Sequence, residues 1–186
     1  MKRFRFPALF SIGLPLLLLL PLLSRFQLPV PSATYSDPFR YCAAVGTVDE
    51  PDARYTGPAV PPTVAEGLRQ AMELPESAPL EPLLLGTFWR CMEGQVYACT
   101  VGANIPCMEK ADLSQTPTEP MIEFCRANPG VDYIPAVVTG RATVYEWRCE
   151  GSEPVVERQL TEPDARGFLS AYWYQISPPE TSSETE

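Results

Sequence analysis

Two near-identical Trp-Arg-Cys steps contain the residues best suited to hold a ligand. They are Trp89-Arg90-Cys91 and Trp147-Arg148-Cys149. Side chains alternate between the faces of a strand, so each arginine should face away from its tryptophan and cysteine, into solvent or onto a neighbouring ring. Guanidinium groups suit bidentate contacts with anions, so Arg90 and Arg148 could form a clamp for a small anion or a carboxylate, with Trp89 and Trp147 beside them. An ordinary exposed pairing with Glu146 or Glu157 is the alternative.

Catalytic chemistry has less support. The chain contains no histidine, which excludes Ser-His-Asp and Cys-His catalysis and histidine-ligated metals. Glu146 and Glu150 could act as the two carboxyls of a glycosidase, but close pairs arise by chance among 23 acidic residues. We therefore expect no catalytic residue, metal or cofactor.

Aromatic residues are the remaining candidates for ligand contact. They could stack on a sugar, although in small disulfide-rich domains such residues usually form the core. The set is Trp89, Trp147, Trp173, Tyr97, Tyr145, Tyr172 and Tyr174.

The six cysteines predict three structural disulfides. They are Cys42, Cys91, Cys99, Cys107, Cys125 and Cys149, with no C-x-x-C pair that would suggest zinc or redox chemistry. Six cysteines allow 15 connectivities. The pairings Cys107–Cys125 and Cys91–Cys149 are expected, the second on the assumption that the two Trp-Arg-Cys strands are neighbours.

The N-terminus predicts export. Lys2, Arg3 and Arg5 precede an uncharged, leucine-rich stretch at 6–24, which is the layout of a secretory signal. A single-pass anchor is the alternative, but the stretch is at the short end of the roughly 20 residues that a span needs, and Pro15 and Pro21 interrupt it. The expected location is the periplasm or the medium of a bacterium.

The charge of the chain limits the class of partner. The net charge is −9, and because residues 1–32 hold four cations and no anions, residues 33–186 carry −13. Lys110 is the one lysine after residue 32. Nucleic acid and anionic membranes need clustered cations and are disfavoured, whereas a basic protein partner is compatible. The membrane would be contacted only through the N-terminal segment, if it is not cleaved.

Four segments are expected along the chain. Residues 1–32 form the signal or an uncleaved anchor, and residues 33–39 form a linker. Residues 40–176 form a single disulfide-rich domain, because about 150 residues suffice for one core. Residues 177–186 form a disordered acidic tail.

Two helices are expected in this domain. One begins at Thr63, where Thr63 and Glu66 fit a capping box and Val64 and Leu68 share a face. Pro79 and Pro82 keep the following stretch irregular. The other begins near Thr116 or Thr118, buries Met121, Ile122 and Cys125, and stops at 128–130.

The strands are expected to be antiparallel. Strands are predicted at 40–48, 142–149, 154–160 and 168–176, together with a hairpin at 87–101. A Glu93-Gly94 turn would place Cys91 opposite Val96 and Cys99 opposite Phe88, on different faces and with different partners. The predicted fold class is α+β: a small antiparallel sheet with two short helices, stapled by disulfides.

Two short motifs recur in the sequence. One is Trp-Arg-Cys, and the other is Glu-Pro-Asp-Ala-Arg, at 50–54 and 162–166. Because the expected order of elements does not repeat with them, similar local turns and strand ends are the preferred explanation, rather than a duplication.

The run from Trp89 through Cys107, with Tyr145–Cys149, resembles an uncharacterised family of small exported cysteine-rich bacterial proteins. This resemblance implies a bacterial compartment and no mechanism. Tyr97-Ala98-Cys99 and Trp147-Arg148-Cys149 also resemble the Tyr-x-Cys strand of periplasmic lysozyme inhibitors.

Three functions follow as hypotheses. The first is a non-enzymatic exported interaction module, and the second is an inhibitor of a basic cell-wall hydrolase such as lysozyme. The third is a carboxylate-based hydrolase.

Overall fold

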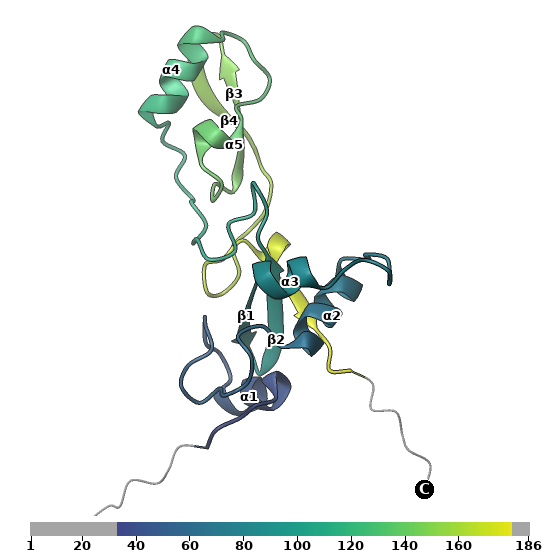
Figure 1. The fold of residues 1–186 in the computed structure, drawn as a ribbon. Coiled ribbons are helices and arrows are strands. Elements are labelled where there is room, and N and C mark those ends of the chain that lie inside the picture. Colours follow the sequence, from purple (N-terminus) through teal and green to yellow (C-terminus); the bar gives the residue numbers. More distant parts are fainter. Residues whose placement is uncertain (1–32, 180–186) are drawn as a thin grey trace, which may run out of the picture. The chain divides into compact units, whose positions relative to one another are not determined.

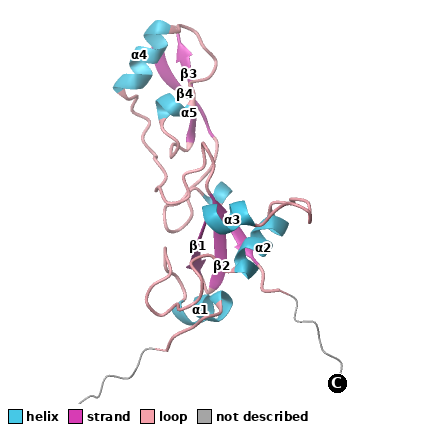
Figure 2. Cartoon of the chain, in the orientation of Figure 1, coloured by secondary structure: helices cyan, strands magenta, loops and turns pink. Residues whose placement is uncertain are grey.

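The computed structural model describes residues 33–179 (Figure 1). The predicted signal and most of the predicted tail, 180–186, lie outside these residues. In the part described, no helix is long and apolar enough to cross a membrane. The α+β class is confirmed, with more helices than expected and with two antiparallel sheets (Figure 2).

The first helix, α1 (Pro38–Val45), replaces the strand expected at 40–48. Asp37 caps it by accepting a hydrogen bond from the Arg40 N–H at 2.7 Å, and Pro38 occupies the first turn, where its missing N–H is tolerated. The strand prediction is wrong because this start signal outweighs the apolar run. Tyr35, in the expected linker, pairs with Tyr55 and packs against the core.

The second helix, α2 (Pro62–Ala71), begins one residue before the predicted cap. Its N-cap is Pro61, so the capping box from Thr63 to Glu66 does not form, but the buried face with Val64 and Leu68 is confirmed. The expectation of irregular structure after Pro79 is also wrong. Pro82 lies in the first turn of a short helix, α3 (Glu81–Gly86), where proline is tolerated.

The hairpin of β1 (Thr87–Met92) and β2 (Gln95–Thr100) has the predicted register. Cys91 lies opposite Val96, and Cys99 lies opposite Phe88. The turn residues Glu93 and Gly94 have φ of 53° and 79°, a left-handed pair that matches the twist of the strands.

A third strand, β5 (Tyr174–Ile176), pairs antiparallel with β2, so the order is β1-β2-β5 and β1 is an edge strand. It is much shorter than the strand expected at 168–176, because a 3-10 turn (Ser170–Tyr172) precedes it.

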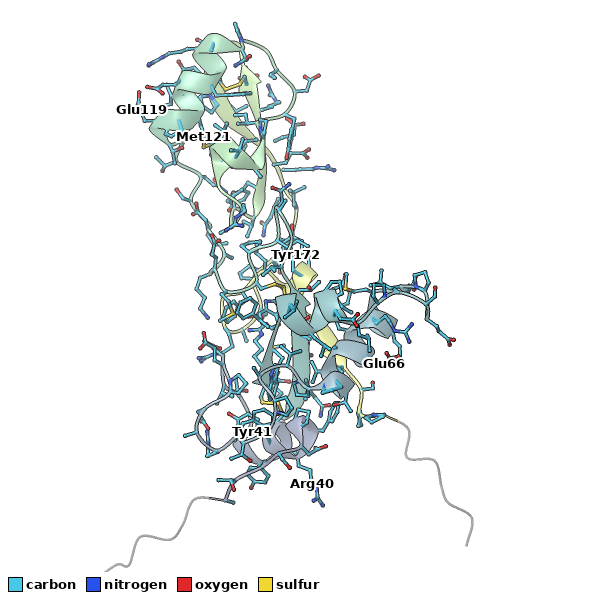
Figure 3. All side chains as sticks on the ribbon, in the orientation of Figure 1. Arg40, Tyr41, Glu66, Glu119, Met121 and Tyr172 are labelled. Atoms are coloured by element: carbon cyan, nitrogen blue, oxygen red, sulfur yellow. A yellow bond between two sulfur atoms is a disulfide. The ribbon has the colours of Figure 1, made fainter. Side chains whose placement is uncertain are left out.

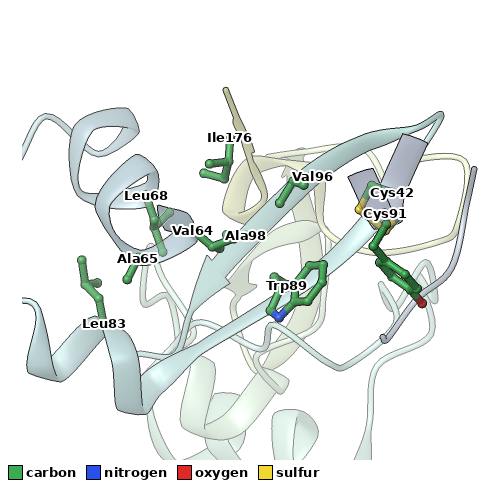
Figure 4. Packing of buried hydrophobic residues seen from close by; sticks show 11 residues of the cluster. Cys42, Val64, Ala65, Leu68, Leu83, Trp89, Cys91, Val96, Ala98 and Ile176 are labelled. Atoms are coloured by element: carbon green, nitrogen blue, oxygen red, sulfur yellow. A yellow bond between two sulfur atoms is a disulfide. The ribbon is translucent and has the colours of Figure 1, made fainter. Parts of the chain in front are cut away.

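The two faces of this sheet are covered by different segments. One face packs against α1, α2 and α3 through a core that includes Trp89, Val96 and Ile176 (Figure 4). The other face packs against Phe168 and Trp173. The strand β1 is therefore buried on both sides at its centre.

The second sheet joins β3 (Tyr145–Glu150) and β4 (Glu153–Gln159), with an irregularity after Glu146. It packs against α4 (Glu119–Ala127), whose Met121 and Cys125 are buried as predicted, whereas Ile122 is only half-buried and lies outside this core cluster. The Thr118 side chain does not cap this helix. A single helical turn, α5 (Ala136–Thr139), lies between α4 and β3 in the chain.

All six cysteines are paired, as Cys42–Cys91, Cys99–Cys107 and Cys125–Cys149 (Figure 3). The prediction that Cys91 and Cys99 bond to different partners is confirmed. The expected pairs Cys107–Cys125 and Cys91–Cys149 are wrong. The two Trp-Arg-Cys strands are in separate sheets, so each cysteine bonds to a helix near its own hairpin instead.

Part of the order of elements repeats, contrary to the interpretation from sequence, although two further helices precede the first hairpin and one precedes the second. In a first half (37–100) and a second half (118–159), a helix carries a cysteine that bonds to the Trp-Arg-Cys strand of the following hairpin. An aromatic residue, Tyr41 or Phe124, precedes each helical cysteine. A Val-Asp pair follows six residues after each cysteine, and a Pro-Ala-Val step follows later, at 58–60 and 135–137.

The Glu-Pro-Asp-Ala-Arg echo is a local turn, as expected. Asp52 accepts a hydrogen bond from the Arg54 N–H at 3.0 Å, and Asp164 accepts one from the Arg166 N–H at 2.8 Å. Only the first copy lies inside a half of the repeat. It is an insertion between Asp49 and Tyr55 that the second half lacks between Asp132 and Tyr133.

Candidate functional site

Arg90 is buried rather than free to bind a ligand. Only 1% of it is exposed, and its Cζ lies 4.3 Å from the ring centre of Phe168 and 4.1 Å from that of Trp173. Its Nη2 donates to the carboxylate of Asp164. The arginine faces away from Trp89, onto neighbouring rings, and it attaches the C-terminal segment to β1.

Asp164 is the anion that matches this buried cation. Burial of the carboxyl opposes its ionisation, but hydrogen bonds from Arg90, Phe168 and Arg166 outweigh that effect and lower the pKa of Asp164. Nε and Nη1 of Arg90 have no hydrogen-bond partner among residues 33–179. Because these nitrogens are also enclosed, the group is structural.

Arg148 lies in the other sheet and has its own partners. Its Nη2 is 3.1 Å from Glu150 Oε1, and its Nε pairs with Glu157. These carboxylates raise the pKa of Arg148. No residue is shared with the environment of Arg90, so the structure does not bring the two arginines together as a clamp, and Arg148 has the ordinary exposed pairing.

The two carboxylates suggested for hydrolysis each form an ion pair with an arginine. Glu146 pairs with Arg158, and Glu150 pairs with Arg148. A pocket of about 130 Å³ beside Trp147 includes Glu146 but not Glu150. The structure therefore does not place the predicted carboxylate pair in one cleft.

The three tryptophans all belong to the core. They are 3%, 3% and 7% exposed at positions 89, 147 and 173. Trp89 packs edge-on against Tyr55, and its Nε1 donates to the carbonyl of Ala59 at 2.7 Å. Of the proposed stacking residues, Tyr145 and Tyr172 line the pocket beside Trp147 together with Tyr133. The tryptophans position the strands rather than offer a surface.

The outer edge of β1, on the side away from β2, is a feature that the sequence reasoning missed. At Cys91 this edge is closed, because Cys91 and Val48 exchange two main-chain hydrogen bonds of 3.0 Å. Antiparallel pairing turns every second residue outward, so the N–H and C=O of Trp89 also point to this edge. Within the described range no hydrogen bond reaches either group.

Beside this open edge lies a largely apolar groove of about 410 Å³, the edge groove. Leu85 and Phe88 are 89% and 41% exposed at its rim, which is unusual for large apolar side chains. Among the described residues, Glu50 is the one charged residue of its lining. The complete lining is Glu50, Pro51, Ala59, Val60, Leu84, Leu85, Thr87, Phe88, Trp89 and Met108.

The arrangement can bind an extended apolar chain. A strand edge offers main-chain donors and acceptors, and the exposed leucine and phenylalanine offer contacts for side chains. One sequence signal could have found it: the Leu83-Leu84-Leu85 run directly before an apolar strand, in which Phe88 is on the face opposite Trp89.

Comparison with known proteins assigns no chemistry to this groove. No protein-family model matches the chain, and no curated protein and no solved structure is significantly similar to it.

Proposed function

We propose that this chain is an exported, non-enzymatic interaction module that binds a partner protein at the edge groove. The observation that carries the proposal is the main chain of Trp89, to which no hydrogen bond runs from the described residues, beside exposed Leu85 and Phe88. A strand edge without a main-chain partner is a template for pairing, and neighbouring exposed apolar side chains mark interaction sites. A bound partner would supply hydrogen bonds to the main chain of Trp89 and would cover Leu85 and Phe88.

The partner is neutral or basic at the contact. Glu50 is the only charge in the lining, and residues 33–186 carry a charge of −13. An acidic segment would be repelled by this field, whereas a segment flanked by lysine or arginine would be attracted.

Export supports this role. Three disulfides indicate an oxidising, extracytoplasmic environment. The basic and leucine-rich residues before position 33 fit a secretory signal, so we place the mature protein in the bacterial periplasm or medium. Expression of the full chain in a bacterium should give a periplasmic or secreted product whose cysteines resist alkylation until a reductant is added.

The binding function is tested by selection of random displayed octapeptides against the protein made from the full chain. The selection should enrich peptides that bind the wild-type protein but do not bind the Phe88→Asp or Leu85→Asp variant. Val137→Asp is the matched control, because Val137 is 92% exposed and lies outside the groove. Failure to enrich any peptide whose binding depends on Phe88 would overturn the proposal.

A further inference from the structure

The second half shows what covers the edge of a Trp-Arg-Cys strand in this fold. Ile134 donates its N–H to the carbonyl of Trp147 at 2.8 Å, and Cys149 donates its N–H to the carbonyl of Val131 at 2.8 Å. The segment from Val131 to Ile134 therefore runs antiparallel along β3. Ile134 is 1% exposed and packs in the same core cluster as Trp147.

In the first half, a segment also pairs with the Trp-Arg-Cys strand, but the pairing stops at Val48. Val48 occupies the place of Val131, since each lies six residues after its helical cysteine and pairs with the strand cysteine. After Val131 the chain continues to Tyr133 and Ile134. After Val48 the insertion at 50–54 intervenes before Tyr55.

In the first half, Thr56 and Gly57 separate Tyr55 from the Pro-Ala-Val step, where the second half has Ile134 alone. Thr56 follows Tyr55 as Ile134 follows Tyr133, but the Thr56 N–H bonds to the carbonyl of Tyr35 at 2.8 Å. The Trp89 carbonyl is thus the counterpart of the satisfied Trp147 carbonyl, without its donor. The edge groove is lined by Trp89 and by Ala59 and Val60 of the first Pro-Ala-Val step, and in the second half Ile134 lies beside the corresponding Trp147 and Ala136.

We propose that the partner binds as an added β-strand. An extended segment runs antiparallel to β1 beyond Val48, exchanges main-chain hydrogen bonds with Trp89, and places an aliphatic side chain in the groove as Ile134 does in the second half. This inference rests on the proposed function and specifies its chemistry. The segment is aliphatic at alternate positions, lacks acidic residues, and belongs to a different protein.

N-methylation of the selected peptides tests strand pairing. Methylation of the amide that faces the Trp89 carbonyl should weaken binding at least about tenfold, because it removes the donor and blocks close approach. Methylation of the next amide, which points away from β1, is the matched control and should leave the affinity within about twofold.

Hydrogen exchange of the protein gives a second readout. A bound peptide should slow exchange of the Trp89 amide at least about tenfold and leave unchanged the Cys149 amide, which already donates to Val131. If neither N-methylation nor Trp89 exchange responds while Phe88→Asp still abolishes binding, the groove binds peptides but strand addition is wrong. If no peptide depends on Phe88, the proposed function itself fails. A Phe88-dependent dimer in the absence of peptide would show that the occupant is a second copy, which contradicts this inference.

Discussion

Asp164 and Arg90 form an ion pair that joins the C-terminal segment to the centre of β1. The side chains are 8% and 1% exposed, so both charges are withdrawn from water. Breaking such a pair leaves a buried charge without compensation, whereas an exposed pair contributes little.

Replacement of Asp164 by alanine should therefore destabilise the protein by about 3–5 kcal/mol. Urea unfolding followed by tryptophan fluorescence measures this loss. The control is Asp52→Ala, in the same Glu-Pro-Asp-Ala-Arg motif, whose partner Arg54 is exposed, and it should shift the midpoint only slightly. Equal shifts for the two variants would show that the buried pair of Arg90 and Asp164 contributes no more stability than the exposed pair of Arg54 and Asp52.

The same pair predicts an acid limit to stability. Because the pKa of Asp164 is lowered in the folded protein, its contribution is fully present above the unfolded value of about 3.9. It is lost as the pH falls through the lower folded value. The free energy of unfolding should decline more steeply below about pH 4 in the wild type than in Asp164→Asn. Parallel curves from pH 7 to pH 2 would contradict this assignment.

The three disulfides should differ in their contributions. Their sequence separations are 49, 24 and 8 residues, and longer loops lose more entropy when they are closed. Removal of Cys42–Cys91, Cys125–Cys149 and Cys99–Cys107 by paired alanine substitutions should cost about 4, about 3.5 and about 2.6 kcal/mol. Thermal or urea unfolding of the three variants checks the order, and the reverse order would rule out loop closure as the main term.

Gly67 should resist substitution because α2 and β5 approach closely there. A Cβ at this position would lie 2.3 Å from Cγ2 of Ile176, a buried β-branched side chain. Gly67→Ala should destabilise by about 1–3 kcal/mol, although alanine favours helices more than glycine does.

Two further variants identify the cause at Gly67. Gln70→Ala, on the exposed side of the same helix, should be nearly neutral. Combining Gly67→Ala with Ile176→Ala should cost less than the sum of the single changes, because the shortened side chain relieves the clash. Additive losses would mean that the contact is unimportant.

Local features of the fold were predictable from the sequence. The Glu93-Gly94 turn and the alternation around it determine the hairpin register, and that register puts Cys91 and Cys99 on opposite faces. The helix at 119–127 follows from its proline, its apolar spacing and Asn128. The strand prediction at 40–48 is wrong because a short apolar stretch fits strand or helix equally well, and only Asp37-Pro38 distinguishes them.

Long-range relationships were not predictable in the same way. The cysteine pairing depends on which helix lies against which hairpin, and the burial of Arg90 depends on Phe168 and Trp173, more than seventy positions later in the chain. The edge of β1 at Trp89 is harder still, because it depends on where the loop after Val48 runs, and there Thr56 gives its N–H to Tyr35. Sequence patterns indicate the local secondary structure that a residue favours, whereas this site depends on which distant residues come into contact.

The insertion at 50–54 also changes how copies of this protein behave toward each other. An uncovered strand edge with exposed leucine and phenylalanine can pair with the same edge of another copy. The acidic surplus opposes that encounter, since like charges repel over roughly a Debye length, about 8 Å at physiological ionic strength. The negative charge should therefore oppose edge-to-edge pairing of copies, and added salt should weaken this opposition.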